Sequence, residues 1–479
     1  MNRIDRFIVN CPSFEEFRQR MAALPDKDKG DILERLTQVY LQTTFEYRTA
    51  LEKVWLLRKA PATVLKAIGL ERDDKGIDLI ARHTNGTYWV IQAKYRTDED
   101  KALGWGDLST FFGLSSAPRR NISLGVVVHT TARPISNRAL MGDKVVEIGL
   151  DRWKSADWSL ILRTIIENAP ARPTAFAPRP EWKQDYVIAE AVKYFKEHTR
   201  GRLLMPCGTG KTLIAFWIAE ALKAKTIIVA VPSLNLIKQS VAVWMRELVA
   251  KRQRPNWLCV ASDDSVGGLD DDEFVDERYD SGLPTTTDVN DIATWLRESG
   301  NHKIIFSTYH SSKAVADAAK LAAVEVDLII FDEAHRTAGG REREFATLVH
   351  DDAIKAGRRL FMTATERKIS GDADVLFSMD DNEEDYGHRF FTMTFKEAID
   401  LGIISDYKLV TYVVTDSEVR GLIKSNRLLN LGENVEEAEA RDVASGIRNA
   451  CRSNTASSTR SCSQEASERR RNSASSRIS

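Results

Sequence analysis

The residues with the clearest capacity for chemistry form a glycine-containing loop, Met205-Pro-Cys-Gly-Thr-Gly-Lys-Thr212. A short apolar run, Leu203-Leu204, precedes the loop, and a segment with helical spacing, residues 213–222, follows it. Glycines let the backbone approach a ligand closely, so its N–H groups and the start of the helix can bind phosphate oxygens. Met205 stands where a glycine is usual, so the loop indicates a phosphate site without deciding it.

The loop provides the groups that bind a nucleoside triphosphate. Lys211 would reach the β- and γ-phosphates, and the Thr212 hydroxyl would ligate Mg²⁺. The predicted nucleotide-binding residues of the loop are Gly208, Thr209, Gly210, Lys211 and Thr212. The loop therefore predicts ATP and Mg²⁺ as cofactors.

A distant acidic motif, Asp332-Glu-Ala-His335, completes this site. It follows residues 326–331, an apolar run without alternation that predicts a buried strand. Ligands of open α/β sheets bind at the carboxyl ends of the strands. Asp332 would hold the Mg²⁺ ion, and Glu333 would position and activate the attacking water. The alternative is a chance acidic pair on a loop, and the strand before each motif argues against it.

A predicted β-hairpin with its turn at Asn85-Gly86 carries a third group of polar residues. Gln92 and Lys94, two residues apart, share one face of the second strand. A two-residue turn would pair Asp78 with Ala93 and put Gln92 and Lys94 on the wrong face. A three-residue turn with a left-handed glycine would pair Asp78 with Gln92 and bring the three side chains together. We predict the three-residue turn.

These three side chains suit metal-dependent cleavage of a phosphodiester. Asp78 would bind Mg²⁺, Gln92 would replace the more usual acidic ligand, and Lys94 would orient the water or stabilise developing charge. The pattern Asp…Gln-x-Lys resembles the Mrr-like branch of restriction-endonuclease-like nucleases, over about residues 45–150. Some of those nucleases add a glutamate from the preceding helix, for which Glu52 is a candidate. The alternative is an ordinary α/β domain, or a catalytically silent relative that binds DNA.

Beyond the phosphate loop, further apolar strands end in small polar clusters, as in nucleotide-driven motors. With the two motifs above, these clusters resemble the first lobe of superfamily 2 helicases and translocases, above all the DEAH-type motors of type I and type ISP restriction enzymes. The resemblance covers about residues 178–378 and implies that Gln184 reads the adenine edge. The nucleic-acid contacts that it implies are Pro232, Ser233, Thr308 and Tyr309. His335, Thr363 and Thr365 would couple those contacts to the nucleotide.

Composition excludes few function classes. A net charge of -1 does not decide for or against nucleic acid, because a local basic groove can exist within a neutral total. The five cysteines have neither metal-binding nor CxxC spacing, which suits a reducing cytoplasm. No secretory signal or membrane-spanning apolar run is present, so we expect a cytoplasmic protein without a membrane partner.

The composition changes sharply around residues 168–181, where four prolines predict an extended linker. The predicted α/β architecture is a helical segment 1–45, an Mrr-like nuclease domain 46–167, the linker 168–181, a RecA-like motor lobe 182–387, a partial second lobe 388–450 and a disordered tail 451–479. The residues past 388 show no arginine motif that would contact the γ-phosphate, so turnover should be slow unless another chain provides one. The Ser/Arg-rich tail is either a natural disordered basic arm that binds phosphates or out-of-frame or truncated sequence that replaces the rest of the lobe, and the loss of hydrophobic periodicity near residue 450 favours the second.

The sequence thus predicts an ATP-dependent helicase- or translocase-type restriction enzyme with a Mg²⁺-dependent endonuclease domain, acting on double-stranded DNA. A nucleotide-dependent DNA-binding protein with an inactive motor is one alternative, and an RNA helicase-like ATPase is another. No methyltransferase segment is visible, so we expect any methyltransferase or specificity subunit to be a separate chain.

Overall fold

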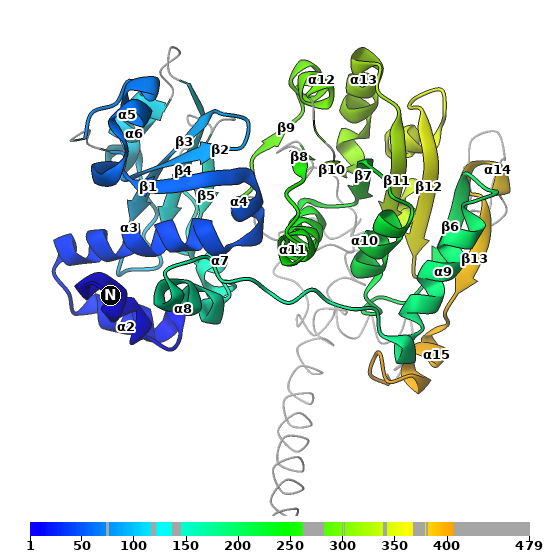
Figure 1. The fold of residues 1–479 in the computed structure, drawn as a ribbon, viewed down its shortest axis with the longest axis horizontal. Helices are drawn as coiled ribbons and strands as arrows, with labels where there is room; N and C mark the ends of the chain where they lie inside the picture. The colour runs from blue at the N-terminus through cyan, green and yellow to red at the C-terminus, as the bar shows by residue number, and fades with distance from the viewer. Residues whose placement is uncertain are drawn as a thin grey trace, which may run out of the picture. The chain divides into compact units, whose positions relative to one another are not determined.

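The computed structural model contains two β-sheets, each covered by its own helices (Figure 1). The structure describes residues 1–72, 76–115, 121–136, 145–261, 282–298, 300, 302–338, 343–366, 379 and 382–406. Most of the predicted second lobe and the whole predicted tail, residues 407–479, lie outside the described residues. Of the helices that the structure describes, none has the length and hydropathy to cross a membrane.

The first sheet is mixed and has the strand order β1-β2-β3-β4-β5. Its strands are β1 (Leu51–Leu56), β2 (Leu79–His83), β3 (Tyr88–Lys94), β4 (Ile122–His129) and β5 (Val145–Ile148). The β1–β2 and β2–β3 pairs are antiparallel, whereas the β3–β4 and β4–β5 pairs are parallel. Between β2 and β3 the N–H of His83 bonds to the Thr87 carbonyl, and Gly86 has a φ of 87°. The predicted three-residue turn is therefore confirmed, and Leu79 lies opposite Ile91.

Helices cover both faces of this sheet. They are α1 (Arg3–Val9), α2 (Phe14–Ala22), α3 (Asp26–Thr43), α4 (Phe45–Ala50), α5 (Ala62–Ile68), α6 (Trp105–Ser115), α7 (Leu150–Lys154) and α8 (Trp158–Glu167). One core joins Phe17 of α2 and Leu36 of α3 to Ile91 of β3 and Trp153 of α7. Residues 1–45 are helical, as expected, and the apolar faces of α1–α3 are buried in the core of the sheet that follows them, so the boundary at residue 45 does not divide two cores. Residues of α5 and α6 build the core on the opposite face.

The second sheet is parallel throughout and has the order β13-β6-β12-β11-β7-β10-β8-β9. Its strands are β6 (Arg200–Leu204), β7 (Thr226–Val231), β8 (Asn256–Val260), β9 (Thr285–Thr286), β10 (Lys303–Thr308), β11 (Val326–Asp332), β12 (Ala356–Thr363) and β13 (His388–Thr392). The central strands β7, β10, β11 and β12 are buried on both faces along most of their length, as expected for a parallel sheet between two layers of helices.

Two layers of helices provide the separate cores of this second sheet. The helices are α9 (Gln184–Tyr194), α10 (Lys211–Ala221), α11 (Leu234–Ala250), α12 (Val289–Arg297), α13 (Ser312–Ala322), α14 (Glu383–Tyr386) and α15 (Phe395–Asp400). Residues of α9, α10, α11 and α15 pack on one face, and those of α12 and α13 pack on the other. The predicted α/β fold is confirmed, and parallel strands place their carboxyl ends at one edge.

The predicted boundary at residues 387/388 is wrong. β13 pairs in parallel with β6 and forms one end of the second sheet. Met393 and Ala398 are buried in the core shared with α9 and α10. Residues 388–405 thus complete the first lobe, and the compact unit to which they belong ends at Ser405. The linker prediction agrees better with the structure, since residues 170–179 lie in neither helix nor strand.

Candidate active sites

The phosphate loop connects β6 to α10 in the predicted strand–loop–helix arrangement. Gly208 and Gly210 each have a φ of 85°, a conformation that glycine adopts at little cost. A Cβ atom at Gly210 would lie 3.1 Å from Gln184 Nε2, so a larger residue would crowd the loop. Met205, in the position where glycine is usual, is buried in the core beneath the loop. The Met205 side chain thus packs in the core, and Gly208 and Gly210 still shape the phosphate-binding loop.

Lys211 and Glu333 face each other although they lie far apart in the sequence. The Lys211 Nζ atom lies 3.3 Å from Glu333 Oε1 and donates a hydrogen bond of 3.2 Å to the Met205 carbonyl. Glu333 has a left-handed φ of 51°, and strain of this kind in a non-glycine residue is typical of functional sites. The fold therefore brings the loop lysine and the acidic motif to one place.

Asp332 ends β11 as a buried carboxylate beside this pair. Burial and then the neighbouring Glu333 carboxylate raise the pKa of Asp332 to about 6, against the opposing effect of the Lys211 ammonium. Thr212 follows Lys211 in the first turn of α10. Carboxylate and hydroxyl oxygens are the hard ligands that suit Mg²⁺, so the chemistry of this donor set fits the predicted metal.

The acidic motif and the Thr363-Ala-Thr365 motif are joined by a hydrogen bond. His335 Nδ1 lies 2.9 Å from Thr363 Oγ1, and the same hydroxyl donates to the Thr365 carbonyl at 2.7 Å. His335 Nδ1 also lies 3.5 Å from Glu333 Oε2. These contacts connect the end of β12 to the expected water-activating carboxylate.

The amide of Gln184 is engaged at both ends within the protein. Its Nε2 donates to the Thr209 carbonyl at 3.3 Å, and its Oε1 accepts from the Arg179 backbone N–H at 3.0 Å. The side chain therefore ties the start of α9 to the phosphate loop. Its expected contact with adenine stays a prediction.

The four residues expected to contact nucleic acid divide into two groups. Pro232 and Ser233 are partly exposed, and the Ser233 hydroxyl caps α11 by accepting from the Leu236 N–H. Thr308 and Tyr309 are both 0% exposed, and the Tyr309 hydroxyl donates to the Asp332 carbonyl at 2.6 Å. Both side chains therefore support the end of β11 from inside, and the expected contact of these two residues with nucleic acid stays a prediction.

The hairpin brings Asp78, Gln92 and Lys94 to one end of the first sheet. The Asp78 N–H bonds to the Ile91 carbonyl at 2.8 Å, and Asp78 Oδ2 accepts from the Ala93 N–H at 2.8 Å. Burial raises the pKa of Asp78, although the Ala93 N–H and the positive charge of Lys94 act in the opposite direction. The register of β2 on β3 and the bond from the Ala93 N–H place the Asp78 carboxylate next to the end of β3 that carries Gln92 and Lys94.

Gln92 gives the strongest test of the predicted metal site. The side chain is only 3% exposed, and its Oε1 atom has no hydrogen-bond partner among the described residues. A buried, unpaired amide oxygen costs about 1–3 kcal/mol and calls for a ligand. An oxygen in this position, beside the Asp78 carboxylate, fits a Mg²⁺ ligand. Among the described residues, however, no group of three or more His, Cys, Asp or Glu is placed to hold a metal.

The sequence did not reveal that Glu34 lies near this site. Burial and then the charge of Asp78 raise the pKa of Glu34 to about 7, while Arg58, 3.1 Å away, lowers it. Glu34 lies on α3, and no local motif marks it, so only the packing of α3 on the sheet could have found it. The candidate Glu52 instead lies on β1 and pairs with Arg82 at 3.2 Å, so Glu34 is the better match to a glutamate from the preceding helix.

Comparison with protein families assigns both parts of the chain. Residues 178–368 match the family described as "Type III restriction enzyme, res subunit", and residues 42–161 match the family described as "Restriction endonuclease". The chain joins a restriction-endonuclease domain to a helicase-type ATPase domain. The Asp78–Lys94 hairpin lies within the restriction-endonuclease match, and all the predicted nucleotide-binding residues lie within the res-subunit match.

Similar proteins agree with this assignment. The type ISP restriction-modification enzyme LlaBIII, described as ATP-dependent and bound to DNA, matches with a TM-score of 0.66 and 26% identity over 83% of this chain and 26% of that chain. Probable helicases from a South African tick isolate and a Malawian tick isolate of African swine fever virus are 31% and 30% identical over 211 and 212 residues, in each case 44% of this chain. The chain spans 21% of the length of these viral relatives.

Proposed function

We propose that this chain is an ATP-dependent, DNA-directed restriction-type enzyme. ATP hydrolysis would move the helicase-type domain along double-stranded DNA, and the nuclease domain would cut the DNA with Mg²⁺. The observation that carries most weight is the pair of contacts between distant motifs in one chain: Lys211 faces Glu333 at 3.3 Å, and Asp78 accepts from the Ala93 N–H, next to Lys94 on β3. The description of LlaBIII as bound to DNA supports DNA as the substrate class.

In the proposed ATP hydrolysis, Lys211 binds the β- and γ-phosphates and Gln184 binds the adenine edge. Glu333 accepts a proton from a water whose oxygen bonds to the γ-phosphorus, while the bond from that phosphorus to the bridging oxygen breaks. ADP and inorganic phosphate are the products. Asp332 and Thr212 would hold Mg²⁺, which when bound neutralises charge on the phosphate oxygens.

In the proposed nuclease reaction, Lys94 orients a water beside the scissile phosphate. The water oxygen bonds to phosphorus and loses a proton to solvent, while the bond from phosphorus to the leaving oxygen breaks and that oxygen takes up a proton from solvent. Asp78 and Gln92, joined by Glu34, would hold Mg²⁺, which when bound polarises the phosphate. The unpaired Gln92 oxygen and the neighbouring carboxylates support this assignment.

DNA contact and coupling complete the proposal. Pro232 and Ser233, at the carboxyl end of β7, are the retained candidates for contacting the DNA backbone. His335, Thr363 and Thr365 would transmit that contact to Glu333 through the hydrogen bonds described above. Any methyltransferase or specificity subunit would be a separate chain, and we place the enzyme in the cytoplasm.

Measurement of ATP hydrolysis with and without double-stranded DNA, with Lys211→Ala as the blank, tests the proposal. We expect hydrolysis that DNA stimulates and that the variant loses. ATP binding without hydrolysis would contradict translocation and would leave the alternative of a nucleotide-dependent DNA-binding protein.

Plasmid nicking in Mg²⁺ should disappear in Lys94→Ala, and nicking that survives this change would arise at a different site. Competition between RNA and DNA for binding would exclude or support the RNA helicase alternative.

A further inference from the structure

A buried carboxylate follows the Thr363-Ala-Thr365 motif directly. The Glu366 side chain is 7% exposed, and two arginines bind its two oxygens. Arg202 Nη1 lies 2.8 Å from Oε1, while Arg389 donates from Nε to Oε1 at 3.0 Å and from Nη2 to Oε2 at 2.5 Å. The paired contact with Arg389 is bidentate, the geometry in which an arginine–carboxylate pair is strongest and most directional.

The two arginines come from segments with different roles. Arg202 lies on β6, the strand that leads into the phosphate loop, and it also donates to the Gly387 carbonyl at 2.9 Å. Arg389 lies on β13, at the start of the exit segment, by which we mean residues 388–405. Glu366 therefore joins the end of the β12 motif to the strand before the phosphate loop and to the chain that leaves this lobe.

The far end of the exit segment returns to the nucleotide site. Glu397 of α15 forms an ion pair with Lys183, the residue before Gln184. A Cβ atom placed on Gly208 of the phosphate loop would lie 3.3 Å from Ile404 Cγ2. The exit segment thus contacts the surroundings of the expected adenine and phosphate sites and is held by Glu366 at its beginning.

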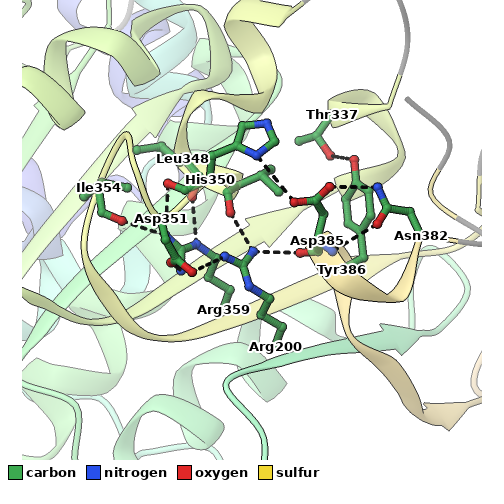
Figure 2. Close-up of polar contacts among 11 residues, drawn as sticks. Arg200, Thr337, Leu348, His350, Asp351, Ile354, Arg359, Asn382, Asp385 and Tyr386 are labelled. Atoms are coloured by element: carbon green, nitrogen blue, oxygen red, sulfur yellow. Dashed lines mark hydrogen bonds and ion pairs between the residues drawn. The ribbon is translucent and has the colours of Figure 1, made fainter. Parts of the chain in front are cut away.

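The turn that carries His335 is also tied to the chain just before the exit segment (Figure 2). The Thr337 hydroxyl, at the end of that turn, lies 2.9 Å from the Tyr386 hydroxyl. Arg200 of β6 donates to the Asp385 carbonyl at 2.8 Å and pairs with Asp351 at 2.8 Å. These contacts anchor the residues before β13, whereas Glu366 and Arg389 connect the Thr363-Ala-Thr365 motif to β13 itself.

We propose that Glu366 and Arg389 are positioning residues that transmit the nucleotide state from the acidic motif to the exit segment. The proposal rests on ATP binding at the proposed site. A phosphate group would draw Lys211 away from Glu333 and change the contacts of Glu333 with His335, which bonds to Thr363 three residues before Glu366. The Glu366–Arg389 pair then transmits a displacement of the Thr363-Ala-Thr365 motif to β13, because two parallel hydrogen bonds fix orientation as well as distance.

The experiment compares the full chain with Arg389→Ala, Arg389→Lys and a control, Lys396→Ala, which changes an exposed residue of α15 in the same segment. Arg389 is the suitable target because its side chain is 47% exposed, and Arg202 continues to pair with Glu366 when Arg389 is removed. Binding of a fluorescent ATP analogue gives affinity. Hydrogen exchange of residues 388–405, with and without Mg²⁺ and a non-hydrolysable ATP analogue, gives the response of the exit segment.

We expect all four proteins to bind the fluorescent analogue with similar affinity. The analogue-induced change in exchange should occur in the wild type and in Lys396→Ala, be absent in Arg389→Ala, and return in part in Arg389→Lys. The DNA-stimulated kcat for ATP should fall at least about fivefold in Arg389→Ala while KM for ATP stays within about twofold, since couplings between sites are typically of this size or larger.

Either of two results in Arg389→Ala would overturn this inference alone: an unchanged exchange response, or a loss of nucleotide affinity, which would make Arg389 part of nucleotide binding. A wild-type chain that binds the analogue but shows no exchange response in residues 388–405 would also overturn it. A wild type that binds no more analogue than Lys211→Ala would refute the proposed ATP site, and this inference with it. Nucleotide binding therefore distinguishes the two failures.

Discussion

Replacement of Gly387 by alanine tests how firmly β13 is held in the sheet of the helicase-type domain. Gly387 joins α14 to β13 with φ 71° and ψ −176°, a region that is open almost only to glycine. A Cβ atom there would lie 2.1 Å from the Arg200 carbonyl oxygen and 2.8 Å from the Gly201 nitrogen. Because both are backbone atoms of β6, neither can turn aside as a flexible side chain could.

The expected cost follows from these two effects. Backbone strain of this kind costs about 1–3 kcal/mol, and forcing atoms into a packed region adds about 1–3 kcal/mol. Gly387→Ala should therefore lower the free energy of unfolding by about 2–6 kcal/mol. If separating β13 from β6 costs less free energy than this strain, β13 should separate from β6 instead. Gly402→Ala is the matched control, since its φ is 66° but nothing lies within 4 Å of the added Cβ. Gly402→Ala should lower the free energy of unfolding by only about 1–2 kcal/mol.

Thermal unfolding of the full-length variants and hydrogen exchange of residues 388–392 measure both outcomes. At about 2–4 °C per kcal/mol, the two variants should differ clearly in the Tm of the helicase-type domain. Exchange in β13 should accelerate in Gly387→Ala and stay unchanged in Gly402→Ala. Equal Tm values together with unchanged exchange would refute the reasoning, because they would mean that β13 accepts the methyl group without leaving β6.

Three further substitutions test the two sites. Glu34→Gln should lower the rate of Mg²⁺-dependent plasmid nicking at least about tenfold, whereas Glu52→Gln should not; equal rates in the two variants would remove Glu34 from the site. Gln92→Leu should raise the Mg²⁺ concentration for half-maximal nicking at least about tenfold while preserving the Tm, because it removes a buried oxygen that lacks a protein partner. An unchanged Mg²⁺ requirement would contradict the role of this oxygen. Thr363→Val removes the bond to His335 and should lower DNA-stimulated ATP hydrolysis at least about fivefold more than basal hydrolysis; equal losses in both would argue against coupling.

The parts of the sites that the sequence predicted depend on local pattern. The turn at Asn85-Gly86 and the spacing of Gln92 and Lys94 determine which side chains share a face, so the hairpin could be predicted to the residue. The phosphate loop and the acidic motif each follow an apolar strand. Parallel strands bring their carboxyl ends to one edge, which explains why Lys211 and Glu333 meet.

The errors concern packing between distant segments. Glu34 lies on a helix whose sequence shows only amphipathic spacing, and its nearness to Asp78 exists only after α3 packs on the sheet. The sequence of β13 predicts a strand but does not show to which lobe the strand belongs. Its pairing with β6 places it in the first lobe and so moves the boundary beyond residue 388. Tyr309 follows a strand end like its counterparts, but its hydroxyl reaches inward to the Asp332 carbonyl, which no spacing rule indicates.

The groups that folding alone would disfavour concentrate at the two proposed sites. Gln92 buries an oxygen without a partner among the described residues, the Asp78 charge raises the pKa of Glu34, and the Glu333 charge raises the pKa of Asp332. Each of these arrangements lowers the free energy of unfolding of the protein without a ligand, and replacement by apolar side chains would remove this cost. Local conflicts of this kind are expected where a ligand completes the interactions. A divalent cation would satisfy the amide oxygen and screen the paired carboxylates together, so the same conflicts that cost stability are the physical argument for metal binding at both sites.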